Sequence, residues 1–442
     1  MPESLDDLAA DLATGRTEPV QLVERALERA RASDAVFITL IEEAALAEAH
    51  AARRRWTEGS PLSRHDGVPI AWKDLFDIVG TRTSAGSRTR DEAPLVTVDA
   101  PAVAATRRLG FIPIGKTNLS EFAFSGLGAN PHFGTPTSDL PGSARMPGGS
   151  SSGSAVVVQR GIVPAAIGTD TAGSVRVPAA FTGCVGYKAS QARYDMAGVF
   201  PLAKSLDSLG PLGRSVADCA TMDAAMRGLA PLPLPEPALH FVIDDSILDD
   251  PAVTAPVRFH FEEVLARLSR HATVRHQRVE AWHRAREAIT RLGWLGAYEA
   301  RQLHLDTLTG PKRPLVDARV LSRLDGAACI SAEAAAELVS IRQIEMQRLR
   351  SELGGATLIL PTVKHIPPLL APLEADPAHF AEVNVATLAL TMIASFLDMP
   401  SVALPTGWTA EGLPLSTQLC AVSGRDDLVL AQANWLEHLL RA

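Results

Sequence analysis

The chain of 442 residues is long enough for one large α/β domain or for two or three smaller ones. Its hydrophobic content of 46% and charged content of 21% are ordinary for a globular protein, and they exclude a disordered, collagen-like or coiled-coil chain. A net charge of −8 and an aromatic content of 5% disfavour extensive binding to nucleic acid.

The N-terminal segment, residues 1–60, has a helical pattern. Its first residues are acidic and lack a basic stretch followed by an apolar one, so we predict no signal peptide and a cytoplasmic protein. Apolar residues recur at helical spacing, as at Leu22 and Ala26, and the pattern ends at Gly59 and Pro61. We expect these helices to pack on the outside of the domain or to form a contact in a homodimer.

From residue 67 to 220 the chain is rich in glycine, serine and other small residues. Glycine costs conformational entropy on folding, so such a region indicates a place where backbone closely approaches backbone or ligand. Its first apolar stretch, residues 68–72, reads as a strand that ends at Lys73. A lysine there either extends to solvent or is held in a desolvated pocket, where a lowered pKa would let it act as a base.

A second segment, residues 147–158, joins a Gly/Ser-rich loop to an apolar helix. It can be a flexible turn with a helix cap. A phosphate-binding loop is the main competitor, but the lysine of that motif is missing. The string GSSSG also fits the nucleophile elbow of α/β-hydrolases, although the preceding residues 142–147 do not read as the strand that an elbow requires.

A third segment, residues 168–179, places Ser174 after several small residues. Backbone N–H groups in such a turn can point toward one spot, as an oxyanion hole requires, but an ordinary tight turn fits equally well. The fourth segment, residues 204–215, reads as a structural polar loop before a helix.

After a proline-rich linker at residues 228–237, strands and helices alternate along the chain. Such alternation predicts a sheet covered by helices on both faces. The expected strands cover residues 239–245, 272–279, 357–361 and 401–405, and the expected helices cover residues 251–269, 282–308, 332–353 and 380–397.

Three other features give weaker signals. The four cysteines are far apart in sequence, which predicts unpaired thiols and no zinc site. The longest uncharged apolar stretch, residues 385–397, is too short to cross a membrane and reads as a core helix. His132 lies near a glycine-rich loop and could be a base, but a structural or surface role is more common for such a residue.

Taken together, these blocks resemble the amidase signature family. The resemblance implies one α/β domain over residues 1–442, with a large, twisted, mixed sheet covered by helices on both faces. The helical segment 1–60 would precede a signature core at 62–220, and residues 221–442 would complete the sheet. The matching blocks are GVPIAWKDLFDIVG at 67–80, GGSSSGSA at 148–155, GTDTAGSVRVPA at 168–179, SLDSLGPLGRS at 205–215 and ALPTGWTAEGLPLSTQL at 403–419.

The resemblance also implies a Ser–Ser–Lys triad. Ser174 would be the acylating nucleophile, Ser150 the bridging serine that follows a cis peptide bond, and Lys73 the base. Ser151 would support this network by hydrogen bonding. No carboxylate–histidine pair occurs in these blocks, so a neutral lysine acting through a second serine would activate the nucleophile.

Backbone N–H groups from Thr171 through Ala172 and Gly173 to Ser174 would form the oxyanion hole. The sequence departs from the common family pattern at Ala172 and at Ser152, where a glycine is usual, and we expect the turn to survive because both residues are small. By the same resemblance, Ala123, Phe124 and Ser125 would line the part of the binding site that holds the acyl or leaving group of the substrate.

The function that this resemblance implies is hydrolysis of a small-molecule carboxamide through a serine acyl-enzyme, with no metal or organic cofactor. Two relatives within the family are alternatives: the glutaminase subunit of a tRNA-dependent amidotransferase, and a hydrolase of carboxylated ureas such as allophanate or carboxybiuret. A catalytically inactive scaffold that keeps the fold is a third, against which the complete Lys73, Ser150 and Ser174 set argues.

Overall fold

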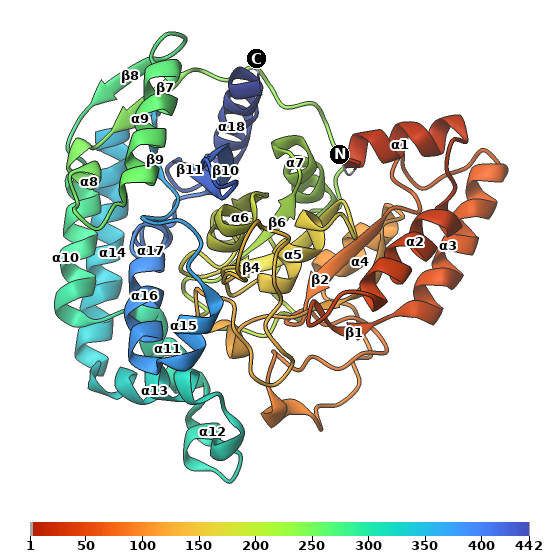
Figure 1. Ribbon diagram of the computed structural model, residues 1–442, viewed down its shortest axis with the longest axis horizontal. Helices are drawn as coiled ribbons and strands as arrows, with labels where there is room; N and C mark the ends of the chain where they lie inside the picture. Colours follow the sequence, from red (N-terminus) through yellow and green to blue (C-terminus); the bar gives the residue numbers. More distant parts are fainter. Residues whose placement is uncertain (1–2, 442) are drawn as a thin grey trace.

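The computed structural model describes residues 3–441, and within that range eleven strands form a single sheet (Figure 1). The strand order across the sheet is β1-β3-β2-β4-β6-β5-β10-β11-β9-β7-β8. The strands are β1 (Phe37–Leu40), β2 (Pro69–Lys73), β3 (Ile112–Thr117), β4 (Ala165–Asp170), β5 (Val185–Lys188), β6 (Ser208–Gly213), β7 (His240–Ile243), β8 (Thr273–His276), β9 (Thr357–Pro361), β10 (Ser401–Trp408) and β11 (Pro414–Cys420).

Helices surround this sheet and account for most of the remaining regular structure. The α-helices are α1 (Leu5–Thr14), α2 (Pro19–Arg31), α3 (Glu42–Thr57), α4 (Pro101–Arg108), α5 (Ser152–Gln159), α6 (Arg176–Thr182), α7 (Val216–Met226), α8 (Asp245–Leu248), α9 (Ala255–Leu268), α10 (Glu280–Leu292), α11 (Leu295–Leu303), α12 (Leu305–Thr309), α13 (Ala318–Gly326), α14 (Ala332–Leu353), α15 (Leu370–Ala375), α16 (Pro377–Leu388), α17 (Thr391–Phe396) and α18 (Asp426–Arg441). Short 3₁₀ helices are η1 (Arg88–Arg90), η2 (Glu121–Ala123), η3 (Arg313–Leu315) and η4 (Ala327–Cys329).

The sheet mixes parallel and antiparallel pairs. Strand β2 runs parallel to both β3 and β4, and β7 runs parallel to both β8 and β9. The pairs β1–β3, β4–β6, β5–β6, β5–β10, β10–β11 and β9–β11 are antiparallel. The predicted α/β fold with a large mixed sheet is therefore confirmed.

Both faces of the central strands are buried under helices. Successive side chains of a strand point to opposite sides, so neighbouring residues of one strand enter different cores. In β2, Ile70 and Trp72 pack into a core shared with α1, α4, α7 and α18, whereas Ala71 packs into a second core shared with α2, α3 and α5. A further core lies at the other end of the sheet, where α10, α14 and α17 cover β7 and β9. Figure 1 shows α1–α3 and the α10–α14 pair on opposite sides of the molecule.

The structure corrects three details of the sequence prediction. The N-terminal helical segment contains a short strand, β1, which pairs with β3. The helix expected at 282–308 is divided into α10, α11 and α12, and the first break lies at Gly293, which has a φ of +94°. The helix expected at 380–397 is divided into α16 and α17. Apolar residues continue through all three breaks, so periodicity alone could not reveal them.

The apolar stretch at 385–397 spans the end of α16 and all of α17. No helix within residues 3–441 is both long enough and apolar enough to cross a membrane. All four cysteines are unpaired, as predicted, and only Cys329 is exposed.

The close packing of the central strands yields a stability prediction at Gly210 in β6. A Cβ added there would lie 2.1 Å from the carbonyl oxygen of Tyr187 in β5. Gly210→Ala should therefore destabilise the protein by about 2 kcal/mol or more, which urea-induced unfolding would measure. Gly326→Ala in α13 is the control, because that position is open and alanine favours a helix by up to about 1 kcal/mol. Equal midpoints for wild type and Gly210→Ala would contradict the close approach.

Candidate active site

Lys73 is the last residue of β2, and its side chain is completely buried. The parallel register pairs Trp72 with Ile167, which brings the end of β4 alongside Lys73. The Nζ atom donates to Oγ of Ser150 at 2.7 Å and to Oγ1 of Thr169 at 2.9 Å. Of the two interpretations that the sequence left open, the buried one is correct, because Lys73 does not reach solvent.

Burial lowers the pKa of Lys73 to about 7, although the nearby carboxylates of Asp170 and Asp207 act to raise it. Burial also acts to raise the pKa of Asp170, but the Arg176 guanidinium at 2.9 Å outweighs it and brings that pKa down to about 2. Asp170 thus forms its ion pair with Arg176 and not with Lys73. Near pH 7, Lys73 is therefore a neutral amine in a substantial fraction of the protein molecules.

Ser150 follows a cis peptide bond with Gly149, as the family resemblance implies. Two backbone hydrogen bonds hold this loop in place. The N–H of Gly149 donates to the carbonyl of Gly126 at 2.8 Å, and the N–H of Ser120 donates to the carbonyl of Ser150 at 3.1 Å. These bonds fix Ser150 against the segment that contains the predicted substrate-binding residues.

The three predicted substrate-binding residues, Ala123, Phe124 and Ser125, are all buried next to that loop. Asn384 of α16 accepts hydrogen bonds at Oδ1 from the Ser125 hydroxyl, at 3.0 Å, and from the neighbouring N–H at residue 126, at 2.8 Å. The guanidinium carbon of Arg323, from α13, lies 4.2 Å from the centre of the Phe124 ring. Helices from the second half of the chain therefore cover this segment.

Ser174 lies in the turn between β4 and α6 and is nearly buried, with 4% of its surface exposed. The N–H of Ser151 donates to the carbonyl of Ser174 at 3.1 Å, and the Ser151 hydroxyl donates to the carbonyl of Thr169 at 3.3 Å. Ser151 thus connects the loop of Ser150 to the turn of Ser174. The hydrogen bonds of Ser151 therefore reach the Ser174 turn and β4, and its role in supporting the triad stays a prediction.

The carboxylate of Asp170 organises the turn that contains Ser174. Its Oδ1 accepts the N–H of Gly173 at 2.8 Å, and its Oδ2 accepts the N–H of Val175 at 3.1 Å. The same carboxylate accepts two hydrogen bonds from the Arg176 guanidinium, at 2.9 and 3.0 Å. The conformation of this turn is therefore set by hydrogen bonds to the buried Asp170–Arg176 ion pair, and not only by bonds within the turn itself.

This arrangement changes the predicted oxyanion hole at one position. The N–H of Gly173 is already engaged by Asp170 and is not free to bind a developing oxyanion. In the described part of the chain, the N–H groups of Thr171, Ala172 and Ser174 make no hydrogen bond. Ala172 does not have a positive φ, so the absence of the usual glycine there leaves the turn intact.

Several residues that shape the site lie within the matching sequence blocks but had no predicted role. Asp207 accepts the hydroxyl of Thr171 at 2.6 Å, and burial raises its pKa to about 6. Asp207, Asp170 and Arg176 share one sequence signal, since each is a charged residue within a stretch of small or apolar residues. Asn384, which bonds to Ser125, and Thr391, whose hydroxyl donates to the carbonyl of Ala172 at 2.6 Å, lie instead in a region without such a signal.

His132 lies outside the Lys73–Ser150 cluster. Its Nε2 atom is 3.3 Å from Oε1 of Glu121, and Oε2 of Glu121 accepts the N–H of Asp317 at 2.6 Å. Among residues 3–441, no group of three or more His, Cys, Asp or Glu side chains is arranged to hold a metal ion.

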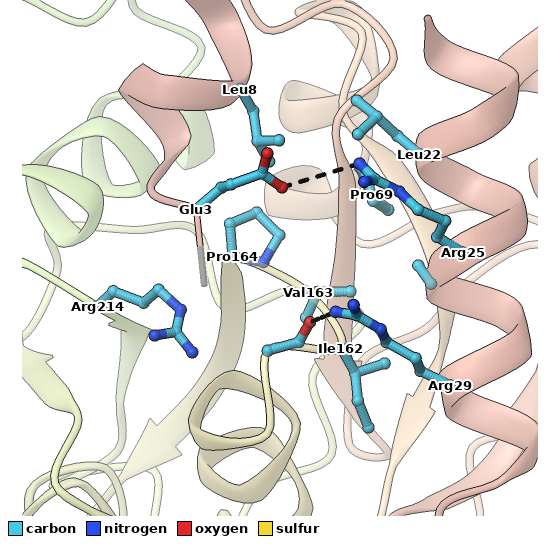
Figure 2. A pocket seen from close by; sticks show the side chains of 12 residues that line it. Glu3, Leu8, Leu22, Arg25, Arg29, Pro69, Ile162, Val163, Pro164 and Arg214 are labelled. Atoms are coloured by element: carbon cyan, nitrogen blue, oxygen red, sulfur yellow. Dashed lines mark hydrogen bonds and ion pairs between the residues drawn. The ribbon is translucent and has the colours of Figure 1, made fainter. Parts of the chain in front are cut away.

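A pocket of about 310 Å³ lies at the opposite ends of β2 and β4 from Lys73 and Asp170 (Figure 2). Arg29 and Arg214 extend toward it from two sides. Arg29 donates to the carbonyl of Gly161 and Arg214 donates to that of Val158, both at 2.8 Å. These arginines therefore hold carbonyls at the C-terminal end of α5, and the pocket is not part of the predicted site.

Comparison with known proteins gives a consistent picture. The family model described as Amidase matches residues 21–240. A crystal structure of an amidase superposes with a TM-score of 0.87 and 33% identity, and the match covers 99% of both chains. The 2-amino-5-chloromuconic acid deaminase of Comamonas testosteroni is 33% identical over 87% of this chain and 84% of its own.

A third relative matches more closely over a shorter region. It is one of the subunits of the glutamyl-tRNA(Gln) amidotransferase of Ralstonia nicotianae, and it is 42% identical over 229 residues. Those residues are 51% of this chain and 45% of the relative. The aligned part thus spans about half the length of that relative.

The buried lysine yields a prediction about stability and pH. Lysine has a pKa of 10.5 in solution and about 7 in the fold, so between these values the unfolded chain binds more protons at this residue and the contribution of Lys73 to stability rises with pH. Lys73→Met removes this dependence. We expect the variant to be more stable than wild type at pH 7 by an amount on the order of 1 kcal/mol, because the lost hydrogen bonds offset part of the gain.

Urea unfolding at about pH 7 and about pH 9 would test this, and the advantage of Lys73→Met should shrink at the higher value. Lys204→Met at an exposed position is the control, and its difference from wild type should stay the same at both values. If Lys73→Met is no more stable than wild type at pH 7, or if its stability relative to wild type grows with pH, the lowered pKa of a buried Lys73 would be contradicted.

Proposed function

The chain belongs to the amidase family, and on that premise we propose that it hydrolyses a small-molecule carboxamide to a carboxylate and ammonia or an amine. Ser174 carries the acyl group, Ser150 relays protons, and Lys73 is the base. The observation that carries the proposal is the 2.7 Å contact between the buried Lys73 amine and the Ser150 hydroxyl. An amine with a pKa near 7 is matched to proton transfer at neutral pH.

In the acylation step, neutral Lys73 accepts the proton of Ser150, and Ser150 accepts the proton of Ser174 as its Oγ attacks the carbonyl carbon of the amide. The carbonyl oxygen becomes an oxyanion, which the N–H groups of Thr171, Ala172 and Ser174 stabilise. Each such donor contributes about 3 kcal/mol of transition-state stabilisation. The relay then returns the proton to the leaving nitrogen, and the C–N bond breaks.

In the deacylation step, water attacks the acyl carbon and gives its proton through Ser150 to Lys73. The second oxyanion is bound at the same N–H groups. It collapses to the carboxylic acid, and the proton held by Lys73 returns through Ser150 to the leaving Oγ of Ser174. The reaction as proposed consumes one amide and one water and requires no cofactor.

The share of this chain that aligns with each relative favours a small-molecule substrate. The deaminase relative, whose name specifies a small organic acid, aligns over 87% of this chain, whereas the amidotransferase relative aligns over 51%. The role of glutaminase subunit in a tRNA-dependent amidotransferase is therefore the second candidate, supported by the higher identity of 42% within the shared region. Hydrolysis of a carboxylated urea is the third.

Ammonia release over a panel of amides would test the assignment of Ser174. Ser174→Ala should reduce the rate by at least about 10³-fold, because the proposed acyl intermediate forms on the Oγ atom that this change removes. A fluorophosphonate probe should label the wild type at Ser174 and leave the variant unlabelled. Ser269→Ala, at the exposed residue that directly follows α9, is the control and should keep full activity.

Glutamine and allophanate belong in the same panel because they separate the alternatives. Preferred release from glutamine, together with recovery of a tRNA-amidating partner in a pull-down, would favour the amidotransferase role. Preferred release from allophanate would favour the urea-type reaction. Equal ammonia release by wild type and Ser174→Ala would exclude the proposed acyl-enzyme.

The pH dependence of the reaction follows from Lys73. Below its pKa of about 7 the amine is protonated and cannot accept the proton of Ser150, so kcat/KM should rise with pH through about 7 and then level off. Lys73→Arg should be inactive across the range, since a guanidinium stays protonated. A wild-type profile that is flat between about pH 5 and 9 would rule out a titrating lysine base.

A further inference from the structure

We infer that the hydroxyl of Thr391, at the first residue of α17, is a positioning group for the proposed oxyanion hole. It holds the peptide group between Ala172 and Gly173 in the orientation that leaves the N–H groups of Ala172 and Ser174 free for the substrate oxygen. This inference rests on the proposed function of Ser174 and extends it to a residue 219 positions further along the chain than Ala172.

The peptide group in question is held at both of its polar ends. The Thr391 hydroxyl donates to the carbonyl oxygen of Ala172 at 2.6 Å. On the other side of the same peptide plane, the N–H of Gly173 donates to Oδ1 of Asp170 at 2.8 Å. Because a peptide group is planar and its C=O and N–H point in opposite directions, these two bonds together fix its rotation.

Gly173 allows this threonine to approach. It has a φ of +135°, and a Cβ built on it would lie 2.2 Å from Oγ1 of Thr391. Both the backbone conformation and the space therefore require a residue without a side chain at this position. The glycine and the threonine hydroxyl form one structural unit, in which the hydroxyl occupies the side that a Cβ would fill.

The two peptide groups that follow are fixed by nearer partners. The carbonyl of Gly173 accepts the N–H of Val177 at 2.7 Å, and the carbonyl of Ser174 accepts the N–H of Ser151 at 3.1 Å. The carbonyl of Ala172 differs from both, because its partner comes from the C-terminal half of the chain. Without that partner its peptide group would be held only by Asp170, and a buried carbonyl without a donor would turn toward the free N–H groups of the hole.

The position of Thr391 is itself secured by the buried ion pair. Nη2 of Arg176 donates to the carbonyl of Thr391 at 3.0 Å and to the hydroxyl of Ser395 at 2.7 Å. Thr391 is completely buried. Replacement by valine, which has nearly the same shape, would therefore remove the hydroxyl while leaving α17 anchored through its backbone.

The test compares Thr391→Val with Thr391→Ser, which keeps the hydroxyl. We expect Thr391→Val to lower kcat about 10- to 100-fold with a change in KM of less than about threefold, because the hydroxyl serves the transition state and not substrate binding. Thr391→Ser should retain kcat within about threefold. A boronic acid that forms a tetrahedral adduct with Ser174 should bind Thr391→Val about 10- to 100-fold more weakly than it binds wild type.

Thr106→Val is the matched control. Thr106 in α4 is also completely buried, and its hydroxyl donates to a backbone carbonyl, that of Val103 at 2.9 Å. The Thr106→Val variant should lose about as much thermal stability as Thr391→Val does, and it should keep the kcat and the boronic-acid affinity of wild type. A loss of folded protein lowers the concentration of active sites and does not change the affinity of those that remain, so the inhibitor constant separates positioning from stability.

A Thr391→Val protein with kcat and boronic-acid affinity within threefold of wild type would overturn the inference while leaving the proposed function intact. Equal losses in Thr391→Ser and Thr391→Val would also overturn it, because the hydroxyl would then not be the group that matters. A wild-type protein that hydrolyses no amide and takes no fluorophosphonate label would overturn both the inference and the proposed function.

Discussion

The amine of Lys73 lies at the buried end of β2, where it donates to two hydroxyls and is closed off from bulk water. Removing a lysine from water lowers its pKa, and here the value comes to about 7. The central strands, the loop of Ser150 and the helices on both faces together produce this burial. The proposed chemistry depends on it, because only the neutral amine can accept a proton.

A buried amine keeps a lowered pKa only if no neighbouring carboxylate pairs with it. Asp170 stands at the end of the adjacent strand and would be such a partner. It is instead held by Arg176, and its remaining acceptor positions are used by backbone N–H groups of the Ser174 turn. One ion pair thus shapes the turn and at the same time leaves the lysine without a salt bridge.

The segments that complete the site come from a different part of the chain than the residues proposed to react. The proposed triad lies within the region 21–240 that matches the family model, whereas Asn384 and Thr391 lie beyond it. Asn384 holds the segment of Ser125, and Thr391 holds the carbonyl of Ala172. Helices that lie outside the matched region therefore help to shape the site.

The sequence by itself determined the α/β class, through the alternation of strands and helices and above all through the resemblance of its blocks to a known family. It also determined the strand that ends at Lys73 and the two serine-bearing loops, because short-range patterns of apolar and small residues mark such elements. It did not predict strand β1, the division of the helix at 380–397, the use of the Gly173 N–H by Asp170, or the bond from Thr391. Those features depend on which segments meet across the folded molecule. A local pattern shows where a strand or loop places a side chain along the chain, and only the tertiary structure decides whether that side chain is buried and which partner it finds there.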